Sequence, residues 1–176
     1  HAFPLARAAF LASHQLSESE EALASYMGLT GTSAWYRMYN DIAARVNVPV
    51  DLPGIGVKEL PIAQVRALAK DADRATRKSA FDAELDGWKT WSVPIAAALN
   101  AIKGEASTLN ARRGYASALE PALAFNNVEA EPLAAMQRAV VASFDDFRRY
   151  MGAKTPPIGV GELLAFYDLF AQMATV

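Results

Sequence analysis

The stretch that decides the fold runs from Asp71 to Ser107 and reads DADRATRKSAFDAELDGWKTWSVPIAAALNAIKGEAS. Its large apolar residues recur every three or four positions, with Ser92 filling the one gap: Phe81, Leu85, Trp88, Ile95, Leu99 and Ile102. This spacing places one side chain per turn on a single face, so we predict a long central helix that buries this face. Pro94 removes one backbone donor and clashes with the preceding turn, which predicts a kink or break near Thr90–Val93.

Helical patterns lie on both sides of this stretch. Apolar spacing predicts shorter helices at 4–14, 18–27, 35–46, 62–70 and 132–151, and a last apolar segment at 161–170. Ser17 and Glu20 form a capping box, in which each side chain accepts a hydrogen bond from the other residue's backbone, and Gly28 is expected to end that helix. The predicted fold class is therefore all-α, as a single domain over 1–176.

The helical rhythm stops at VNVPVDLPGIGVKELP, residues 46–61. Val46, Val48 and Val50 alternate with other residues, and a turn-forming Pro53-Gly54 follows. Such a pattern predicts a short β-hairpin or an extended loop near 46–60, with Pro49 confined to an edge strand.

Composition excludes several classes of protein and site. The 176 residues are 52% apolar with a net charge of −2, so disorder and a nucleic-acid partner are not expected. The chain has no cysteine, which rules out disulfides and thiolate metal sites and is compatible with a cytoplasmic location. No apolar run is long enough for a membrane helix, so no membrane partner is expected.

Residues able to carry chemistry are scarce. Only His1 and His14 are histidines, and no His-Glu-x-x-His motif occurs, so we predict no catalytic and no metal-binding residue in this chain. His14 follows a helix end, where a capping or solvent-exposed role is expected. The acidic groups at 18–21, 82–86 and 145–146 are interpreted as first-turn or locally paired charges on exposed helix faces.

The sequence Arg112-Arg113-Gly114-Tyr115 is different in kind. Two guanidinium groups, a flexible glycine and a phenol could hold a peptide carboxylate or carbonyl, so Arg113 and Tyr115 are candidate peptide-binding residues. The more ordinary alternative is a helix junction, with Tyr115 packed inward and the arginines paired to acids.

Four phrases, taken in order, resemble the N-terminal, non-catalytic region of the oligoendopeptidase F family of zinc peptidases. They are LSESEEALASYMGLTGTSAW (16–35), DADRATRKSAF (71–81), ALNAIKGEASTLNARRGYASAL (98–119) and AFYDLFA (165–171). Arg113-Gly114-Tyr115 and Tyr167-Asp168-Leu169 carry most of the resemblance. One departure is Gln172, where the family usually has proline after the residue equivalent to Ala171.

The resemblance implies a mostly helical protein with a deep channel between lobes, in which short peptides are cut. Arg113 and Tyr115 are then the candidate residues of this substrate channel. The family's zinc ligands and general base lie in a His-Glu-x-x-His helix and a later glutamate, C-terminal to the region that this chain resembles. The chain is therefore expected to lack the catalytic domain, to bind no cofactor and to be inactive alone. Zinc is implied for the full-length parent, whose catalytic domain would be the partner of this region.

Two other functions stay open. The chain could be a stand-alone helical module that binds peptides or a protein, or a purely structural helical protein. If it is a fragment, apolar residues at its two ends should be exposed and could join two copies in a homodimer. The expected residues are Leu163, Leu164, Phe166, Tyr167 and Phe170, with Phe10 and Leu11 at the other end.

Overall fold

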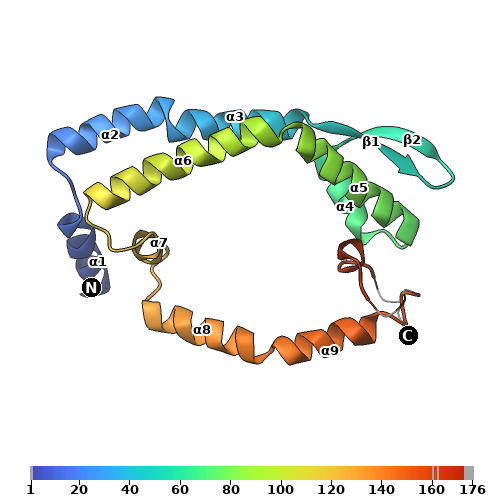
Figure 1. Cartoon of the computed structure of the whole chain (residues 1–176). Helices are drawn as coiled ribbons and strands as arrows, with labels where there is room; N and C mark the ends of the chain where they lie inside the picture. The colour runs from blue at the N-terminus through green and yellow to red at the C-terminus, as the bar shows by residue number, and fades with distance from the viewer. Residues whose placement is uncertain (1, 160, 162, 173–176) are drawn as a thin grey trace. The chain divides into compact units, whose positions relative to one another are not determined.

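The structure, a computed structural model, describes residues 2–159, 161 and 163–172, without the side chains of Ala2 and Phe3. The chain is mainly helical, as predicted, with one antiparallel pair of strands in the described part (Figure 1). In order, the elements are α1 (Ala2–Ser13), α2 (Glu18–Thr30), α3 (Thr32–Arg45), β1 (Asn47–Leu52), β2 (Gly56–Pro61), α4 (Ile62–Ala67), the 3-10 helix η1 (Leu68–Lys70), α5 (Arg74–Thr90), α6 (Ser92–Arg112), α7 (Leu119–Asn126), α8 (Ala130–Ala142), α9 (Phe144–Lys154) and the 3-10 helix η2 (Phe166–Asp168).

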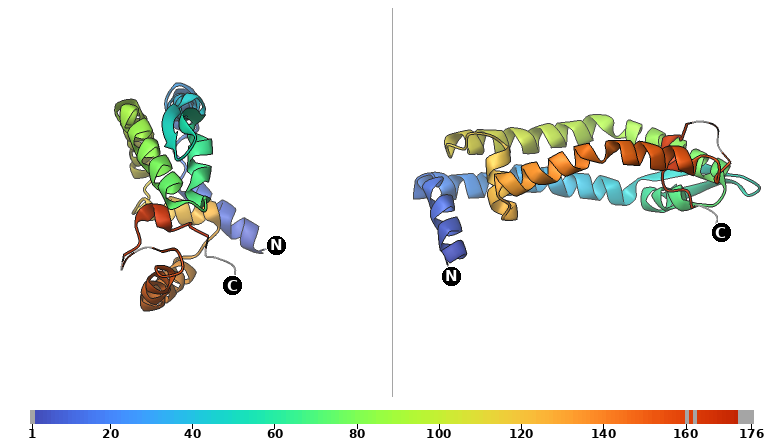
Figure 2. Two further views of the ribbon diagram at one scale, coloured as in Figure 1. Left: turned by 90° about the vertical axis from the view of Figure 1, so that its right-hand side faces the viewer. Right: turned by 90° about the horizontal axis from the view of Figure 1, so that it is seen from below.

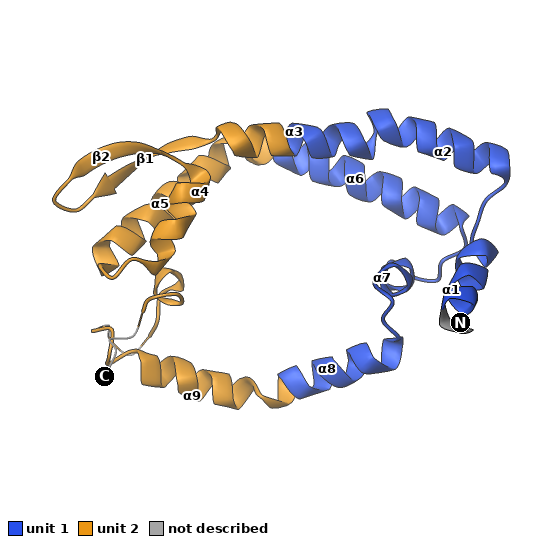
Figure 3. Ribbon diagram, turned by 180° about the vertical axis from the view of Figure 1, so that it is seen from behind, with its two compact units in different colours: residues 1–39, 95–140 blue, residues 40–94, 141–176 orange. Residues whose placement is uncertain are grey.

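The chain packs into two compact units, each made of two separate segments (Figure 3). Unit 1 contains residues 1–39 and 95–140, and unit 2 contains residues 40–94 and 141–176. The prediction of one helical domain over 1–176 stays a prediction. In the described part, no helix combines the length and the apolar character that crossing a bilayer requires.

The core of unit 2 forms between the hairpin and helices α4 and α5. Strand β1 pairs antiparallel with β2 in a register that places Val48 opposite Leu60 and Val50 opposite Lys58, which confirms the predicted hairpin. Alternation along β1 buries one side of the strand, as a period of two requires. The buried residues of this core are Val46, Val48, Val50, Ile62, Val65 and Ala80.

The central stretch divides into two helices in the region where Pro94 predicts a break. Helix α5 ends at Thr90, α6 begins at Ser92, and Trp91 between them is outside both helices. Pro94 thus falls in the first turn of α6, where its missing N–H costs no intrahelical hydrogen bond.

The face that the central stretch buries was predicted incorrectly in part. Leu85 and Leu99 are each 54% exposed, whereas the buried positions in α5 and α6 are Arg77, Ala80 and Ala98. The remaining predicted residues, Phe81, Trp88, Ile95 and Ile102, are half-buried. One reason is that a small residue lets a neighbouring side chain approach the helix: a Cβ added at Gly87 would lie 2.4 Å from Val48 Cγ1 of β1. Small residues of α5, and not its largest ones, therefore mark the side of the helix that packs against β1.

Two predicted helix boundaries also need correction. Helix α2 continues past Gly28 and ends at Thr30, with the Gly31 N–H bonded to the Met27 carbonyl. The helix expected over 132–151 is interrupted at Ser143, which precedes a new first turn containing Asp145 and Asp146. Acidic residues favour a helix N-terminus, which accounts for a start there.

The apolar segment at 161–170 forms only the 3-10 turn Phe166–Asp168 in its described part. Its backbone is held by contacts of Asp168 with another helix, described below, instead of by a helical repeat.

In unit 1, helix α2 lies alongside α6 (Figures 1 and 2). The predicted capping box at Ser17 and Glu20 starts α2. At its other end, Glu105 of α6 accepts a hydrogen bond from the Thr32 backbone N–H, at 2.8 Å. A side chain at Gly31 would occupy this space, because an added Cβ would lie 2.3 Å from Glu105 Oε2.

Candidate functional site

The predicted channel residues lie at the C-terminal end of α6, in unit 1. Gly114 has φ of +74°, the left-handed conformation that glycine adopts most easily. The Gly114 N–H bonds to the Ala111 carbonyl at 3.2 Å, and the Tyr115 N–H reaches back to the Asn110 carbonyl at 3.1 Å. This pair of hydrogen bonds is the Schellman motif, which ends a helix and fixes the direction of the next residues. It sets Arg113 and Tyr115 in place.

Arg113 forms a bidentate ion pair with Glu21 of α2. Its Nε lies 3.0 Å from Glu21 Oε1, and its Nη2 lies 2.6 Å from Glu21 Oε2. The hydrogen bond from Arg113, followed by the one from the Leu16 backbone, lowers the pKa of the Glu21 carboxyl, and the pKa of Arg113 is raised in return. The first-turn role proposed for Glu21 is therefore incomplete, because its carboxylate also joins α2 to α6. A peptide carboxylate would have to compete with Glu21 for this guanidinium.

Tyr115 stacks on His14, which comes from the end of α1. The ring centroids are 4.1 Å apart and the planes differ by 16°, while Phe10 packs on the other rings at 4.8 Å from His14. His14 Nδ1 lies 2.9 Å from the Arg113 carbonyl oxygen, so Nδ1 carries the hydrogen and donates. His14 is thus a partly buried residue whose side chain caps the Arg113 carbonyl at the end of α6, so the capping alternative fits and the solvent-exposed alternative is wrong.

An apolar groove of about 400 Å³ adjoins this cluster and shares Phe10 and Glu120 with it. Its walls come from α1 and from α7 and the residues after it: Ala6, Arg7, Phe10, Glu120, Leu123, Ala124, Asn127, Val128 and Glu129. Glu120 also lies 4.0 Å from His14 Nε2. The groove has the mixture of apolar walls and a few charged groups that is typical of a small binding surface.

Among residues 2–159, 161 and 163–172, no group of three or more His, Cys, Asp or Glu side chains is placed to hold a metal ion. The cluster supplies a paired guanidinium, a phenol ring and carboxylates. Arg112, the other arginine of the motif, lies 3.9 Å from Glu20 on the surface.

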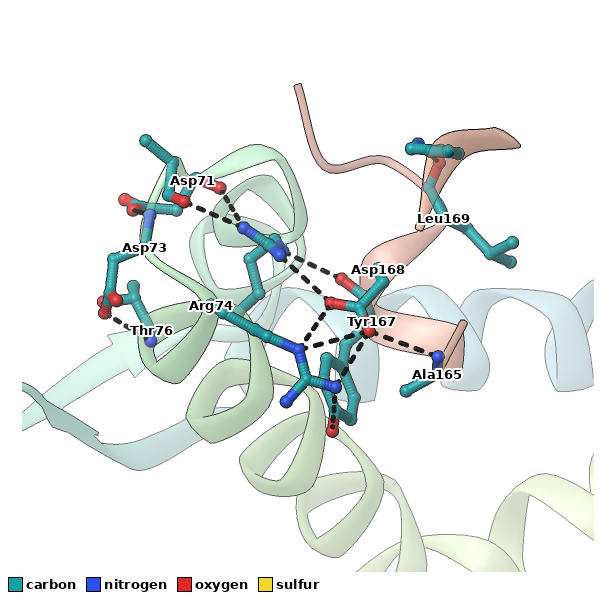
Figure 4. Close-up of polar contacts among 11 residues, drawn as sticks. Asp71, Asp73, Arg74, Thr76, Ala165, Tyr167, Asp168 and Leu169 are labelled. Carbon is teal, nitrogen blue, oxygen red and sulfur yellow. Dashed lines mark hydrogen bonds and ion pairs between the residues drawn. The ribbon is translucent and has the colours of Figure 1, made fainter. Parts of the chain in front are cut away.

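A second polar cluster, in unit 2, was not predicted (Figure 4). Arg74 and Arg77, one turn apart on α5, both donate to the carboxylate of Asp168, with distances of 3.0–3.3 Å. Asp168 is completely buried and Arg77 is 2% exposed. We call Arg74, Arg77, Tyr167 and Asp168 the arginine–aspartate clasp.

Backbone groups complete the clasp. Arg77 donates to the carbonyl oxygens of Asp71, Ala72 and Tyr167 at 2.9–3.1 Å. The Ala165 N–H donates to Asp168 Oδ2 at 3.2 Å. Each donor group of Arg77 therefore has an acceptor, as a buried charge requires.

The electrostatics of the clasp favour an ionised aspartate. Burial, the largest single influence, acts to raise the pKa of Asp168, but the hydrogen bonds from Arg74 and Arg77 outweigh it and the pKa lies below its ordinary value. The pKa of Arg74 is raised, chiefly by its hydrogen bond to Asp168. Arg74 also lies over the Tyr167 ring, 4.9 Å from its centre.

Comparisons with known proteins give structural likeness only. No protein-family model matches the chain, and no curated protein sequence matches it. A solved structure titled "putative peptidase from Chlamydophila abortus" is similar with a TM-score of 0.84 and 18% identity, over 98% of this chain and 29% of that chain. A structure titled "putative oligoendopeptidase F from Bacillus anthracis str. Ames" is similar with a TM-score of 0.65 and 17% identity, over 80% of this chain and 25% of that chain.

These likenesses concern the fold alone. The chain spans less than a third of the length of either solved structure. Its helices and hairpin follow, over nearly its whole length, the fold of one segment of the Chlamydophila abortus protein.

Proposed function

We propose that this chain is the N-terminal, non-catalytic part of a zinc-dependent oligoendopeptidase that hydrolyses short peptides. In this proposal the chain forms scaffold and one wall of the substrate channel. The observation that supports it best is the likeness over 98% of the chain to a segment of a structure titled as a peptidase. The ordered phrases around Arg113-Gly114-Tyr115 and Tyr167-Asp168-Leu169 point in the same direction.

In this proposal, zinc is bound by the part of the full-length parent protein that lies outside this chain. The described residues of this chain do not gather a ligand set, and the sequence contains only two histidines and no cysteine. The metal would activate a water molecule for attack on a peptide carbonyl. This chain would contribute by limiting which peptides reach that centre, and the parent would act in the cytoplasm.

The test compares this chain with the longer protein encoded by the reading frame that contains it. The longer protein should contain a His-Glu-x-x-His motif, carry zinc and cleave quenched fluorescent peptides, and a chelator should abolish the cleavage until zinc is restored. The chain alone should do none of these. A longer protein without the motif, zinc or hydrolysis would contradict the proposal. Saturable peptide binding by the chain alone would favour the stand-alone binding module.

The channel role of Arg113 and Tyr115 can be tested in the longer protein. Glu21→Gln weakens the competitor for Arg113, so the KM for peptides should fall if Arg113 contacts a peptide carboxylate. Tyr115→Phe keeps the stacking on His14 and removes only the hydroxyl, so KM should rise with little change in kcat if that hydroxyl binds peptide.

Tyr26→Phe is the matched control for Tyr115→Phe, because Tyr26 is an exposed tyrosine of the same unit. Unchanged KM values for both channel variants would assign Arg113 and Tyr115 a purely structural role at the α6 end.

A further inference from the structure

The segment 163–171 buries the charged side chain of Asp168 while three of its large apolar side chains stay exposed. Its inward side is fixed by the clasp and by Lys154, whose ammonium donates to the Leu169 carbonyl at 2.5 Å. Asp168, Lys154 and Ala171 are all buried. Burying ionised groups costs desolvation free energy, which the hydrogen bonds from Arg74 and Arg77 to Asp168 offset here.

Three large apolar side chains of this segment face solvent. Leu163 is 86% exposed, Phe166 is 66% exposed and Phe170 is 59% exposed. We call these three residues the C-terminal apolar face. They belong to a backbone that the clasp holds in one conformation, so little ordering entropy is lost when a partner covers them.

Two hollows in unit 2 continue this face. A hollow of about 250 Å³ has Phe166 and Phe170 in its wall, together with Val65 and Phe81. A second, of about 450 Å³, is lined by Leu163, Leu164 and three apolar residues of α9, Phe144, Phe147 and Met151. Both could accept apolar side chains.

The charges beside the two hollows are paired. Arg66 is bonded to Glu84, and Arg148 lies 2.6 Å from Asp145. A partner of this surface would therefore gain little from being anionic, and an apolar protein surface fits it better than a nucleic acid or a phosphate.

We infer that the C-terminal apolar face is the docking surface for the remaining polypeptide of the longer protein, an inference that rests on the proposed function. The similar solved structure supports this occupant, because the segment that matches this chain is only 29% of a longer folded chain. The clasp then holds this face in the conformation that the remaining polypeptide meets.

The experiment uses the absence of cysteine in this chain. Phe166→Cys and Phe170→Cys are made singly, in the longer protein and in the chain alone at a dilution where sedimentation shows a monomer, and alkylation of each thiol is followed by mass spectrometry. The rates should be at least roughly tenfold slower in the longer protein, because burial removes the thiol from the reagent. Val57→Cys is the matched control: Val57 is 69% exposed in the same unit, and its rate should not change.

Leu163→Cys provides a variant that disturbs folding least, since this side chain is the most exposed of the three. Equal rates in the two proteins, with peptide hydrolysis intact in the longer one, would overturn the inference and leave the proposed function standing. Protection without zinc or hydrolysis would overturn the proposed function and support the docking surface. Protection in the longer protein that disappears on dilution would assign the face to a second copy and overturn the inference.

Discussion

At the residue scale, one carboxylate holds the clasp together. Asp168 has a lowered pKa, so its ionised form stabilises the folded chain fully above the ordinary aspartate pKa of about 4. This stabilisation is lost as the pH falls through the lowered native value. Asp168→Asn should therefore lower the midpoint of thermal unfolding at neutral pH, and the difference in midpoint from the unsubstituted chain should shrink in acid. Melting curves from neutral pH to acid measure this.

Asp82→Asn is the control for that series. Asp82 pairs with Lys78 on the exposed side of α5, the helix that also carries Arg74 and Arg77. Exposed pairs contribute little to stability. The unfolding midpoint of Asp82→Asn should stay near that of the unsubstituted chain. If the unfolding midpoints of Asp168→Asn and the unsubstituted chain differed by the same amount in acid as at neutral pH, Asp168 would not act through its charge.

Sequence reasoning finds local pairs and misses distant ones. Lys78 and Asp82 lie four residues apart on α5, a spacing that predicts an ion pair, and the structure contains this pair. Arg77 precedes Lys78 directly in the sequence, but it is buried against Asp168, 91 positions away. Helical spacing reports neighbours three and four residues apart, so it contains no information about such a partner. The available signal was Tyr167-Asp168-Leu169, one of the strongest parts of the resemblance.

The same limit applies to the candidate site. The sequence indicated a junction at Arg113-Gly114-Tyr115, because glycine after a helix ends it. It could not identify Glu21 and His14 as the partners, since they come from α1 and the start of α2.

At the scale of elements, the contact between α5 and β1 depends on a glycine. An alanine Cβ at Gly87 would lie 2.4 Å from Val48 Cγ1, and Val48 is buried in the core. Gly87→Ala should therefore destabilise unit 2 by about 1–3 kcal/mol, the usual cost of overpacking, despite the better helix propensity of alanine. Denaturant unfolding followed by circular dichroism measures this change.

Gly152→Ala is the matched control within the same unit. Gly152 is also helical, and an added Cβ would meet nothing within 4 Å. This substitution should stabilise the chain by roughly 0.5–1 kcal/mol, because alanine loses less backbone entropy than glycine. If both variants shifted stability in the same direction, the close approach at Gly87 would not be what sets the packing of α5.

Local signals predicted the elements better than their packing. The capping box at Ser17, the hairpin after Val46 and the break before Pro94 depend on neighbouring residues, and all three are present. The buried face of the central stretch was inferred from its largest side chains, whereas Ala80 and Gly87 mark the face that packs. Large residues favour burial, but only small ones permit close approach of a neighbouring backbone.

At the scale of the whole molecule, the set of residues expected to be exposed is partly correct. Leu163, Phe166, Phe170 and Leu11 are exposed, while Leu164, Tyr167 and Phe10 are half-buried. Tyr167 is drawn inward because its hydroxyl and backbone carbonyl belong to the clasp, which the sequence pattern did not reveal.

The exposed apolar residues predict that the chain alone associates with itself. A self-complementary apolar surface closes most simply in a symmetric dimer, so the average mass in sedimentation should rise with concentration. The double substitution of Phe166 and Phe170 by serine should abolish this rise. The matched control replaces Ile55 and Val57, exposed apolar residues of the hairpin in the same unit, and should leave it unchanged. A monomer at all concentrations would contradict the homodimer, and equal loss of association in both variants would show that the contact is not specific to the C-terminal apolar face.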